Sequence, residues 1–216
     1  MNLNEINCKE IFQKAYEKRY TWGSDFKGYK GKCTFSINDE IYEGSFILGK
    51  DFKPEIHGIN NESIKKSIAS QLFEVSIHRV KREFESIHAQ NKFNFLNSSD
   101  EGIEMIIEGK NEGDKYRVKN HCINMVYRKI HGTIIEIFVD DFLDTGSGFL
   151  SKKYASQQIN PETLEKASPK LEYQDNFIKV EPQNCWILKS RFIKYLNVSK
   201  EEEIQKFYFD EIFLLS

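Results

Sequence analysis

The chain has 216 residues, of which 39% are hydrophobic, and a formal net charge of −2. A chain of this length buries roughly 70% of the surface that it exposes when unfolded, which is enough for one domain with a substantial core. Its 31 Lys and Arg residues are interleaved with 33 Asp and Glu residues, which excludes the basic patch of a typical nucleic-acid-binding protein. We therefore expect a single domain over residues 1–216 and no nucleic-acid partner.

The N-terminal residues and the cysteines indicate a compartment. The opening MNLNEINCKE has neither the basic region nor the apolar region of a signal peptide, and no apolar run approaches the length of a transmembrane helix. Cys8, Cys33, Cys122 and Cys185 are widely spaced, with no CxxC pair. This spacing favours reduced thiols buried in the core over disulfides or a zinc site. We expect a cytoplasmic protein, or one in an equivalent reducing compartment.

The first third of the chain predicts a short helix followed by strands. A helix from about Cys8 to Tyr20 begins with Asn7 and Glu10 at the spacing of a capping box. From Tyr29 onwards the hydrophobic period is two, and Asn38-Asp39 marks the turn of a hairpin. A third short strand, over residues 52–56, contains Pro54, which restricts it to the edge of a sheet or to a bulge.

The segment from Asn61 to Gln90 predicts one long helix. Asn60 is a suitable N-cap, and no Gly or Pro interrupts the next twenty-nine residues. At 1.5 Å per residue, such a helix would be roughly 40 Å long and could cross a whole sheet.

The apolar stripe of this helix changes sides midway. An α-helix turns by about 100° per residue, which places Ile64, Ile68, Leu72 and Val75 on one face. Further along the helix the same face carries His78, Arg79 and Arg82. The opposite face carries further apolar residues, namely Phe73, Ile77, Val80, Phe84 and Ile87. We expect His78 and Arg82, four residues apart, to be neighbours at one end of an apolar track. The alternative is an ordinary solvent-exposed helix surface.

The second half of the chain predicts antiparallel strands. The strand candidates are residues 92–96, 103–108, 115–119, 123–130, 133–143, 149–157, 171–180, 185–196 and 204–215. Most connections are short turns, which require antiparallel neighbours because a parallel crossover needs a dozen or more residues. The longest connection, residues 160–170, contains two prolines.

Together these elements predict an α+β fold. We expect about eleven strands in a wide, curved antiparallel sheet, wrapped around the one long helix, with a short N-terminal helix, because an open sheet of this width has to curl. This architecture resembles the half-barrel of the LolA/LolB-like periplasmic lipoprotein carriers. The absence of a recognisable signal peptide departs from those carriers, and a fold does not by itself define a function.

Four segments carry a resemblance to a family. They are AYEKRYTW (15–22), IHRVKREFE (77–85), LDTGSGFLSKKY (143–154) and FYFDEIFLL (207–215). They resemble an uncharacterised cyanobacterial and chloroplast family of about this length, the domain of unknown function 3386. The resemblance spans nearly the whole chain. It implies a photosynthetic source, and the family offers no catalytic residues to transfer.

The triplet Asp144-Thr145-Gly146 matches the nucleophile triplet of aspartic proteases. Those enzymes need two carboxylates that share one proton, and one triplet supplies only one of them. A homodimer could supply the second, but Asp141 stands where the motif requires an apolar residue. The alternative is a turn between strands, in which Asp144 accepts local backbone hydrogen bonds and Gly146 permits the bend.

The histidines and tryptophans are candidate ligand-binding residues. His78 and His88 are ten residues apart, about 280° around a helix, so they cannot share a metal-binding face. We expect no metal and no cofactor, although a site assembled across the fold is an alternative. Trp22 and Trp186 are candidates for lining a ligand cavity, and such residues are more often simply core.

These observations favour a binding protein over an enzyme. The hypothesis is a non-enzymatic protein that holds an amphipathic small molecule, such as a lipid or pigment precursor, in an apolar groove between helix and sheet. The alternative is a protein-interaction or assembly factor of a photosynthetic organism, and the third possibility is an aspartic-type hydrolase that uses Asp144. The predicted ligand-binding residues are His78, Arg79, Arg82, Leu72, Val75, Trp22 and Trp186.

Overall fold

The computed structural model describes residues 6–216, which divide into two compact units. Unit 1 contains residues 6–20 and 82–172, and unit 2 contains residues 21–81 and 173–216. The chain passes from one unit to the other three times, so neither unit is a continuous segment. The prediction of one domain over residues 1–216 stays a prediction.

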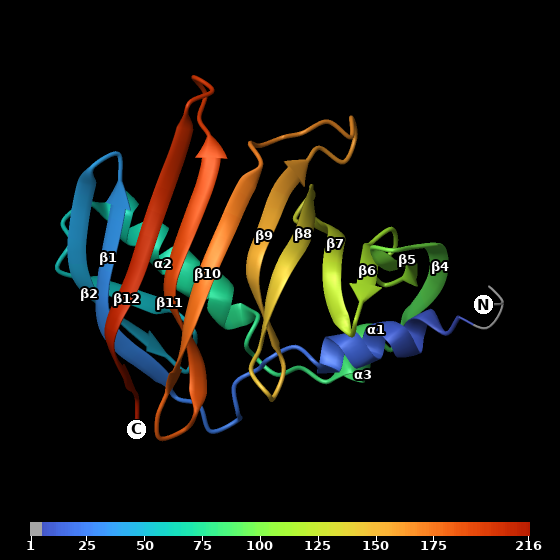
Figure 1. Ribbon diagram of the computed structural model, residues 1–216, viewed down its shortest axis with the longest axis horizontal. Coiled ribbons are helices and arrows are strands. Elements are labelled where there is room, and N and C mark those ends of the chain that lie inside the picture. Colours follow the sequence, from blue (N-terminus) through green and yellow to red (C-terminus); the bar gives the residue numbers. More distant parts are fainter. Residues whose placement is uncertain (1–5) are drawn as a thin grey trace. The chain divides into compact units, whose positions relative to one another are not determined.

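Unit 1 is an antiparallel meander with two helices. Its elements are α1 (Cys8–Glu17), α3 (Phe84–His88), β4 (Asn91–Ser99), β5 (Gly102–Gly109), β6 (Lys115–Lys119), β7 (Cys122–Ile130), β8 (Thr133–Asp144) and β9 (Phe149–Ile159). The strands lie side by side in chain order, each antiparallel to the next. Helix α1 packs against β4, β6 and β7 (Figure 1). This arrangement follows from the short turns, as the sequence predicts.

Aromatic side chains fill the core of unit 1. Phe12 and Tyr16 of α1 contact Phe84 of α3, with ring centroids 6.2 and 5.7 Å away. The ring of Tyr116 on β6 lies 4.5 Å from that of Phe12. All four side chains are buried. Their large apolar area makes this cluster a main source of hydrophobic stabilisation.

Unit 2 contains the remaining strands of the twelve-stranded sheet and one helix. Its elements are β1 (Gly28–Ile37), β2 (Glu40–Gly49), β3 (Pro54–His57), α2 (Glu62–Ile77), β10 (Leu171–Val180), β11 (Cys185–Leu196) and β12 (Glu202–Leu214). The strand order is β3-β2-β1-β12-β11-β10, and α2 contacts β1 and β3 (Figure 1). Strand β3 lies at the edge of the sheet, and its first residue is Pro54. At this position the missing N–H of proline does not interrupt the hydrogen bonds between interior strands.

The hairpin at Asn38-Asp39 also confirms the sequence prediction. Ile37 pairs with Glu40, and both turn residues have positive φ, 47° and 67°. These angles are those of a two-residue type I′ turn, in which Asn and Asp are favoured. Over residues 6–216 the structure contains twelve strands, where the sequence predicted about eleven.

The prediction of one long helix over residues 61–90 is wrong. Helix α2 ends at Ile77, and α3 begins only at Phe84. The N-cap of α2 is Asn61 rather than Asn60, and its side chain accepts hydrogen bonds from the backbone N–H of Ser63 and of Ile64. The two helices also belong to different units. The sheet is therefore not wrapped around one long helix.

The change of apolar face explains why the helix is interrupted. Ile68, Leu72 and Val75 of α2 are buried in unit 2, whereas Phe84 joins the aromatic core of unit 1. A single straight helix would point these two apolar faces in nearly opposite directions. Breaking the helix allows both faces to be buried, which offsets the loss of a few backbone hydrogen bonds. The changing stripe was the local signal for the break.

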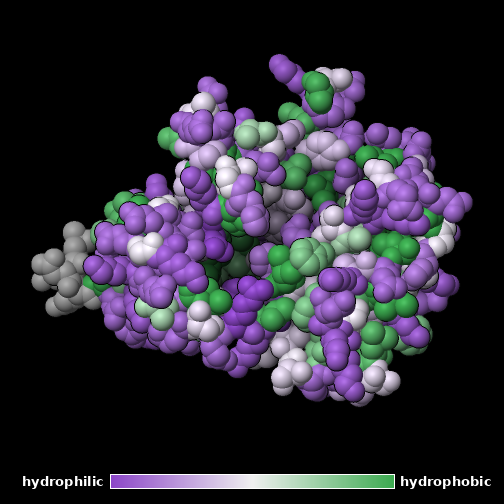
Figure 2. Space-filling model, turned by 180° about the vertical axis from the view of Figure 1, so that it is seen from behind, coloured by the Kyte–Doolittle hydropathy of each residue, from purple (hydrophilic) through white to green (hydrophobic). Residues whose placement is uncertain are grey.

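The polarity of the surface and the state of the cysteines agree with what the sequence predicts. Hydrophilic side chains predominate on the face of the molecule shown in Figure 2, and 30% of the residues are charged. All four cysteines are free and buried, as expected. In the part of the chain that the structure describes, no helix is both long and apolar enough to cross a membrane.

Candidate functional site

The residues predicted to form an apolar track lie inside the core of unit 2. The side chains of Leu72 and Val75 on α2 are 0% and 3% exposed. His78, which caps the C-terminus of α2, is exposed. Because both aliphatic side chains are already packed, they offer no open surface to a ligand. Binding along this track would require α2 to move.

Three of the predicted site residues do meet in unit 2. The backbone N–H of Trp22 donates to the carbonyl oxygen of Arg79 at 2.8 Å, and its indole Nε1–H donates to the carbonyl oxygen of Trp186 at 3.1 Å. Trp22 is buried and stacks on Phe26, with ring centroids 4.1 Å apart. Through these bonds Trp22 connects the end of α2 to β11. This packing gives Trp22 a structural role, and the lining of a ligand cavity by Trp22 and Trp186 stays a prediction.

The continuous helix that would make His78 and Arg82 neighbours is absent from the described residues. The helix ends between them, and Arg82 belongs to unit 1 whereas His78 belongs to unit 2. Four residues make neighbours only within a continuous helix. Arg82 instead acts electrostatically on Arg19 of unit 1.

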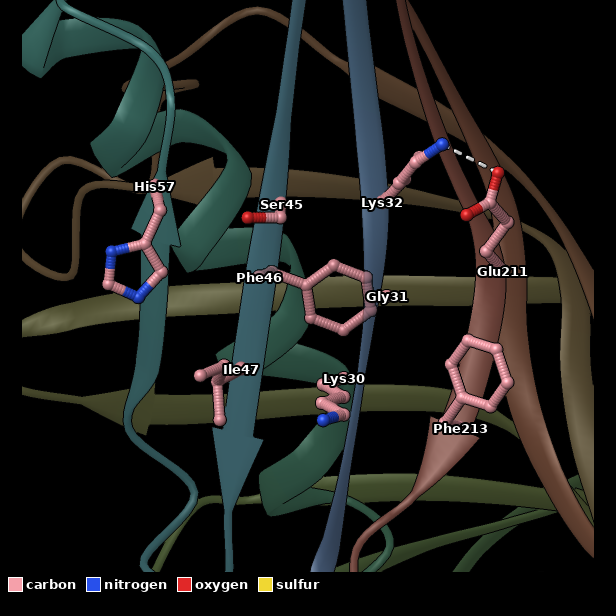
Figure 3. A pocket seen from close by; sticks show the side chains of 9 residues that line it. All are labelled: Lys30, Gly31, Lys32, Ser45, Phe46, Ile47, His57, Glu211 and Phe213. Carbon is pink, nitrogen blue, oxygen red and sulfur yellow. Dashed lines mark hydrogen bonds and ion pairs between the residues drawn. The ribbon is translucent and has the colours of Figure 1, made fainter.

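A groove that the sequence analysis did not predict lies on the exposed face of β3, β2, β1 and β12 (Figure 3). We call it the lysine groove, and it has a volume of about 240 Å³. Strand register places Lys30 directly between Ile47 on β2 and Phe213 on β12. These apolar neighbours are 38% and 61% exposed. The groove is lined by Lys30, Gly31, Lys32, Ser45, Phe46, Ile47, His57, Glu211 and Phe213.

A β-bulge shapes the groove. Lys30 pairs with Phe213 and Lys32 with Asp210, so one residue of β1 faces two residues of β12. The bulged residue Glu211 has φ of 49°, a left-handed conformation that is costly for a non-glycine residue. Opposite the bulge, a Cβ on Gly31 would lie 2.6 Å from the carbonyl oxygen of Asp210. Glycine is therefore required there, and its missing side chain leaves the ring of Phe46 at the base of the groove.

The charges of the groove are mostly paired, with one exception. The ammonium of Lys32 lies 2.7 Å from a carboxylate oxygen of Glu211, which raises the pKa of Lys32. His57 lies 3.6 Å from Glu55. Within residues 6–216, Lys30 makes neither an ion pair nor a side-chain hydrogen bond. The groove thus combines exposed apolar walls with one uncompensated cation.

The sequence alone predicts only part of this groove. The alternation in β1 and β2 places Lys30 and Ile47 on the exposed faces of their strands. Their alignment with Phe213, 166 positions after Ile47 in the chain, depends on the pairing of β1 with β12 and on the bulge. Neither is visible in a local pattern.

Comparison with protein families identifies the relatives of this chain. The model of a family described as protein of unknown function, DUF3386, matches residues 3–215. The chain belongs to the DUF3386 family. This confirms the resemblance, whereas the photosynthetic source that the resemblance implied stays a prediction.

Two solved structures resemble the DUF3386 protein weakly. A DUF1329 family protein from Desulfovibrio piger has a TM-score of 0.32 at 9% identity, covering 97% of this chain and 95% of its own. A LolA superfamily protein from Nitrosomonas europaea has a TM-score of 0.36 at 9% identity, covering 98% and 94%. At these values neither structure indicates what the DUF3386 protein binds. No curated protein matches the sequence.

The Asp144 triplet forms a turn in this DUF3386 protein. A carboxylate oxygen of Asp144 accepts a hydrogen bond from the backbone N–H of Gly146 at 2.8 Å. Thr145 donates its hydroxyl hydrogen to the carbonyl oxygen of Gly148 at 2.7 Å, and Gly146 has φ of 80°. The turn interpretation is confirmed. Residues 6–216 contain no cluster of three or more His, Cys, Asp or Glu side chains arranged to hold a metal.

Proposed function

We propose that this DUF3386 protein is a non-enzymatic binding protein for an amphipathic anion, which it holds in the lysine groove of unit 2. The observation that carries the proposal is the unpaired Lys30 between the exposed side chains of Ile47 and Phe213. Apolar walls favour a hydrocarbon or aromatic group, and the ammonium favours a carboxylate or phosphate head.

The size of the groove limits what it holds. Its volume of about 240 Å³ lies below the several hundred Å³ of a pocket that encloses a drug-sized ligand. A fatty-acid chain or an aromatic ring would therefore be only partly buried, and the affinity would be modest. The expected ligand class is the lipid or pigment-precursor class that the sequence indicates, and we place its site in the lysine groove rather than along the α2 track.

Titration with a fluorescent fatty acid tests the proposal. We expect Lys30→Met to weaken binding about fivefold, because it removes the charge but keeps the aliphatic stem, and an exposed ion pair is worth up to about 1 kcal/mol. The matched control is Lys50→Met, an exposed lysine of unit 2 outside the groove. The wild-type affinity should also fall as salt is added.

Two results would contradict the proposal. Equal affinities for the wild type and Lys30→Met would remove Lys30 from the site. Equal binding of the fatty acid and its uncharged fatty-alcohol analogue would show that no anionic head is recognised. The competing hypothesis of a protein-interaction factor predicts that no amphiphile binds and that a protein partner protects Ile47 and Phe213 from hydrogen exchange of their backbone amides.

A further inference from the structure

A second cleft, which we call the arginine cleft, lies on unit 1 across β6, β7 and β8, neighbouring strands of the sheet (Figure 1). Its volume of about 510 Å³ is larger than that of the lysine groove and falls in the range of small-molecule pockets. All of its lining residues belong to unit 1. They are Glu101, Arg117, Lys119, Asn120, Cys122, Asn124, Phe138, Val139, Asp140 and Phe142.

A β-bulge holds the side chain of Arg117 in this cleft. Strand β7 has one extra residue, Asn124, where it pairs with Arg117 and Val118 of β6. An extra residue interrupts the alternation of side chains between the two faces of a strand, and the buried side chain of Asn124 lies beside that of Arg117. Its Oδ1 accepts a hydrogen bond from Nε–H of Arg117 at 3.3 Å, and its Nδ2–H donates to the carbonyl oxygen of Glu101 at 3.0 Å.

The outer end of the Arg117 guanidinium is available to a ligand. Its Nη2 lies 3.9 Å from a carboxylate oxygen of Glu101, which is beyond hydrogen-bonding distance. In the part of the chain that the structure describes, neither Nη group of Arg117 has a hydrogen-bond acceptor. The side chain of Arg117 is only 19% exposed, whereas that of Glu101 is 65% exposed. A largely buried cation therefore stands next to a carboxylate without being hydrogen-bonded to it.

The lining of the cleft carries both signs of charge. Arg117 and Lys119 supply two cations, and Glu101 and Asp140 supply two carboxylates. Lys119 and Asp140 are exposed, and within residues 6–216 neither forms an ion pair. A simple anion would be repelled by the two carboxylates, and a simple cation would be repelled by the two cations. A zwitterion is the class of ligand that compensates both signs.

Apolar surface accompanies these charges. Phe138 is 38% exposed, and the half-buried side chains of Val139 and Phe142 also line the cleft. Strand register places Phe138 in one row with Arg117, with Met125 between them. The guanidinium carbon of Arg117 lies 5.8 Å from the centroid of the Phe138 ring. At this distance one small molecule contacts both the cation and the ring.

We infer that the arginine cleft binds a zwitterionic α-amino acid with an apolar or aromatic side chain. Arg117 binds the carboxylate through the two parallel hydrogen bonds that a guanidinium donates. Glu101 binds the ammonium, which an α-amino acid carries next to its carboxylate, and the side chain packs on Phe138. The inference rests on unit 1 alone and does not depend on the lysine groove.

The test compares four probes on the full wild-type chain near pH 7, at constant ionic strength. L-phenylalanine carries all three groups, 3-phenylpropanoate lacks the ammonium, 2-phenylethylamine lacks the carboxylate, and glycine lacks the ring. We expect L-phenylalanine to bind most tightly and each of the others at least about fivefold more weakly, because each loses one contact. Saturable shifts of the NMR signals of the Asn124 side-chain amide measure binding in the cleft.

Variants locate the two charged contacts. Arg117→Gln should weaken binding of L-phenylalanine at least about tenfold, because it removes two charge-assisted hydrogen bonds. The matched control is Arg82→Gln, an exposed arginine of unit 1 outside the cleft, which should bind like the wild type. Glu101→Gln should weaken binding of L-phenylalanine about threefold to fivefold. The same variant should strengthen binding of 3-phenylpropanoate, because it removes a carboxylate that repels the anion.

Three results would overturn the inference. One is equal affinity of the wild type for L-phenylalanine and for either probe that lacks one charge, a measurement that does not require any variant to fold. Another is the absence of a saturable shift at Asn124 with L-phenylalanine. A third is equal affinity of the wild type and Arg117→Gln for L-phenylalanine.

Discussion

Arg191 of unit 2 is a charged residue that is almost completely buried, with 2% of its surface exposed. Its Nε and Nη2 donate to the two carboxylate oxygens of Asp175 at 2.8 and 2.7 Å, and Nη1 donates to Gln71 of α2 at 2.9 Å. A buried pair of this kind contributes little net stability, but removing one partner leaves an uncompensated charge. The pair therefore makes the position of α2 on the sheet depend on β10 and β11.

We expect Asp175→Asn to lower the free energy of unfolding by up to about 3–5 kcal/mol, because it removes the buried carboxylate that holds Arg191 through two hydrogen bonds. The partly exposed Glu74 of α2, 3.3 Å away, then remains as a carboxylate partner of Arg191. Urea unfolding measures the change. The matched control is Asp210→Asn, which breaks the exposed pair with Lys189 at 3.6 Å and should cost no more than about 1 kcal/mol. Equal losses in the two variants would contradict the role of burial.

His88 should make stability depend on pH. Its pKa in the folded protein is about 4, lowered from 6.5 mainly by burial and then by Arg128 and Arg19. Between these values the unfolded chain binds more protons, so stability is complete above about pH 6.5 and falls as the pH drops towards 4. We expect His88→Gln to flatten the stability profile in this window. The exposed His121→Asn should keep the wild-type slope, and a wild-type slope in His88→Gln would refute the assignment.

At the scale of the element, the start of α2 depends on one side chain. Asn61 caps the first turn by accepting from Ser63 and Ile64, whereas Asn60 lies one residue outside. We expect Asn61→Ala to destabilise the protein by about 1 kcal/mol and Asn60→Ala by less than about 0.5 kcal/mol. Thermal unfolding of the two variants shows which asparagine is the N-cap. A larger loss of stability in Asn60→Ala than in Asn61→Ala would support Asn60, the N-cap predicted from the sequence.

The conformation of the bulge between β1 and β12 also depends on one residue, Gly31. A methyl group at Gly31 would meet the carbonyl oxygens of Asp210 at 2.6 Å and Glu211 at 3.2 Å. We expect Gly31→Ala to cost about 1–3 kcal/mol through this overpacking and to weaken fatty-acid binding to the lysine groove. Gly49→Ala, whose nearest contact is at 3.4 Å, is the control. Unchanged stability in Gly31→Ala would mean that the backbone at the bulge moves to accommodate the methyl group without lowering the free energy of unfolding.

At the scale of the whole molecule, the three chain crossings make independent unfolding of the units unfavourable. The two tryptophans, Trp22 and Trp186, both belong to unit 2, so their fluorescence reports unit 2, whereas the far-ultraviolet circular dichroism reports both units. We expect the two thermal transitions to coincide, as for one cooperative domain. A fluorescence transition separated from the circular dichroism transition would refute the single-domain prediction.

The features that the sequence determined are local. Asn7 caps α1 by accepting from the backbone N–H of Glu10, the Asn38-Asp39 hairpin forms as its turn residues require, and Asp144 closes a turn between two strands. Each depends on residues a few positions apart, whose spacing alone defines the hydrogen bond or the backbone angle. The antiparallel order of neighbouring strands follows in the same way from short connections.

Only the tertiary structure decided where the long helix breaks and which residues share a site. The segment after Ile77 contains no helix breaker, and the helix ends because Val75 and Phe84 are buried in different cores. The row of Ile47, Lys30 and Phe213 exists because the first strand pairs with the last one across a bulge. Burial and register of this kind are set by contacts between distant segments, which outweigh the local preferences of the sequence because they remove more apolar surface from water.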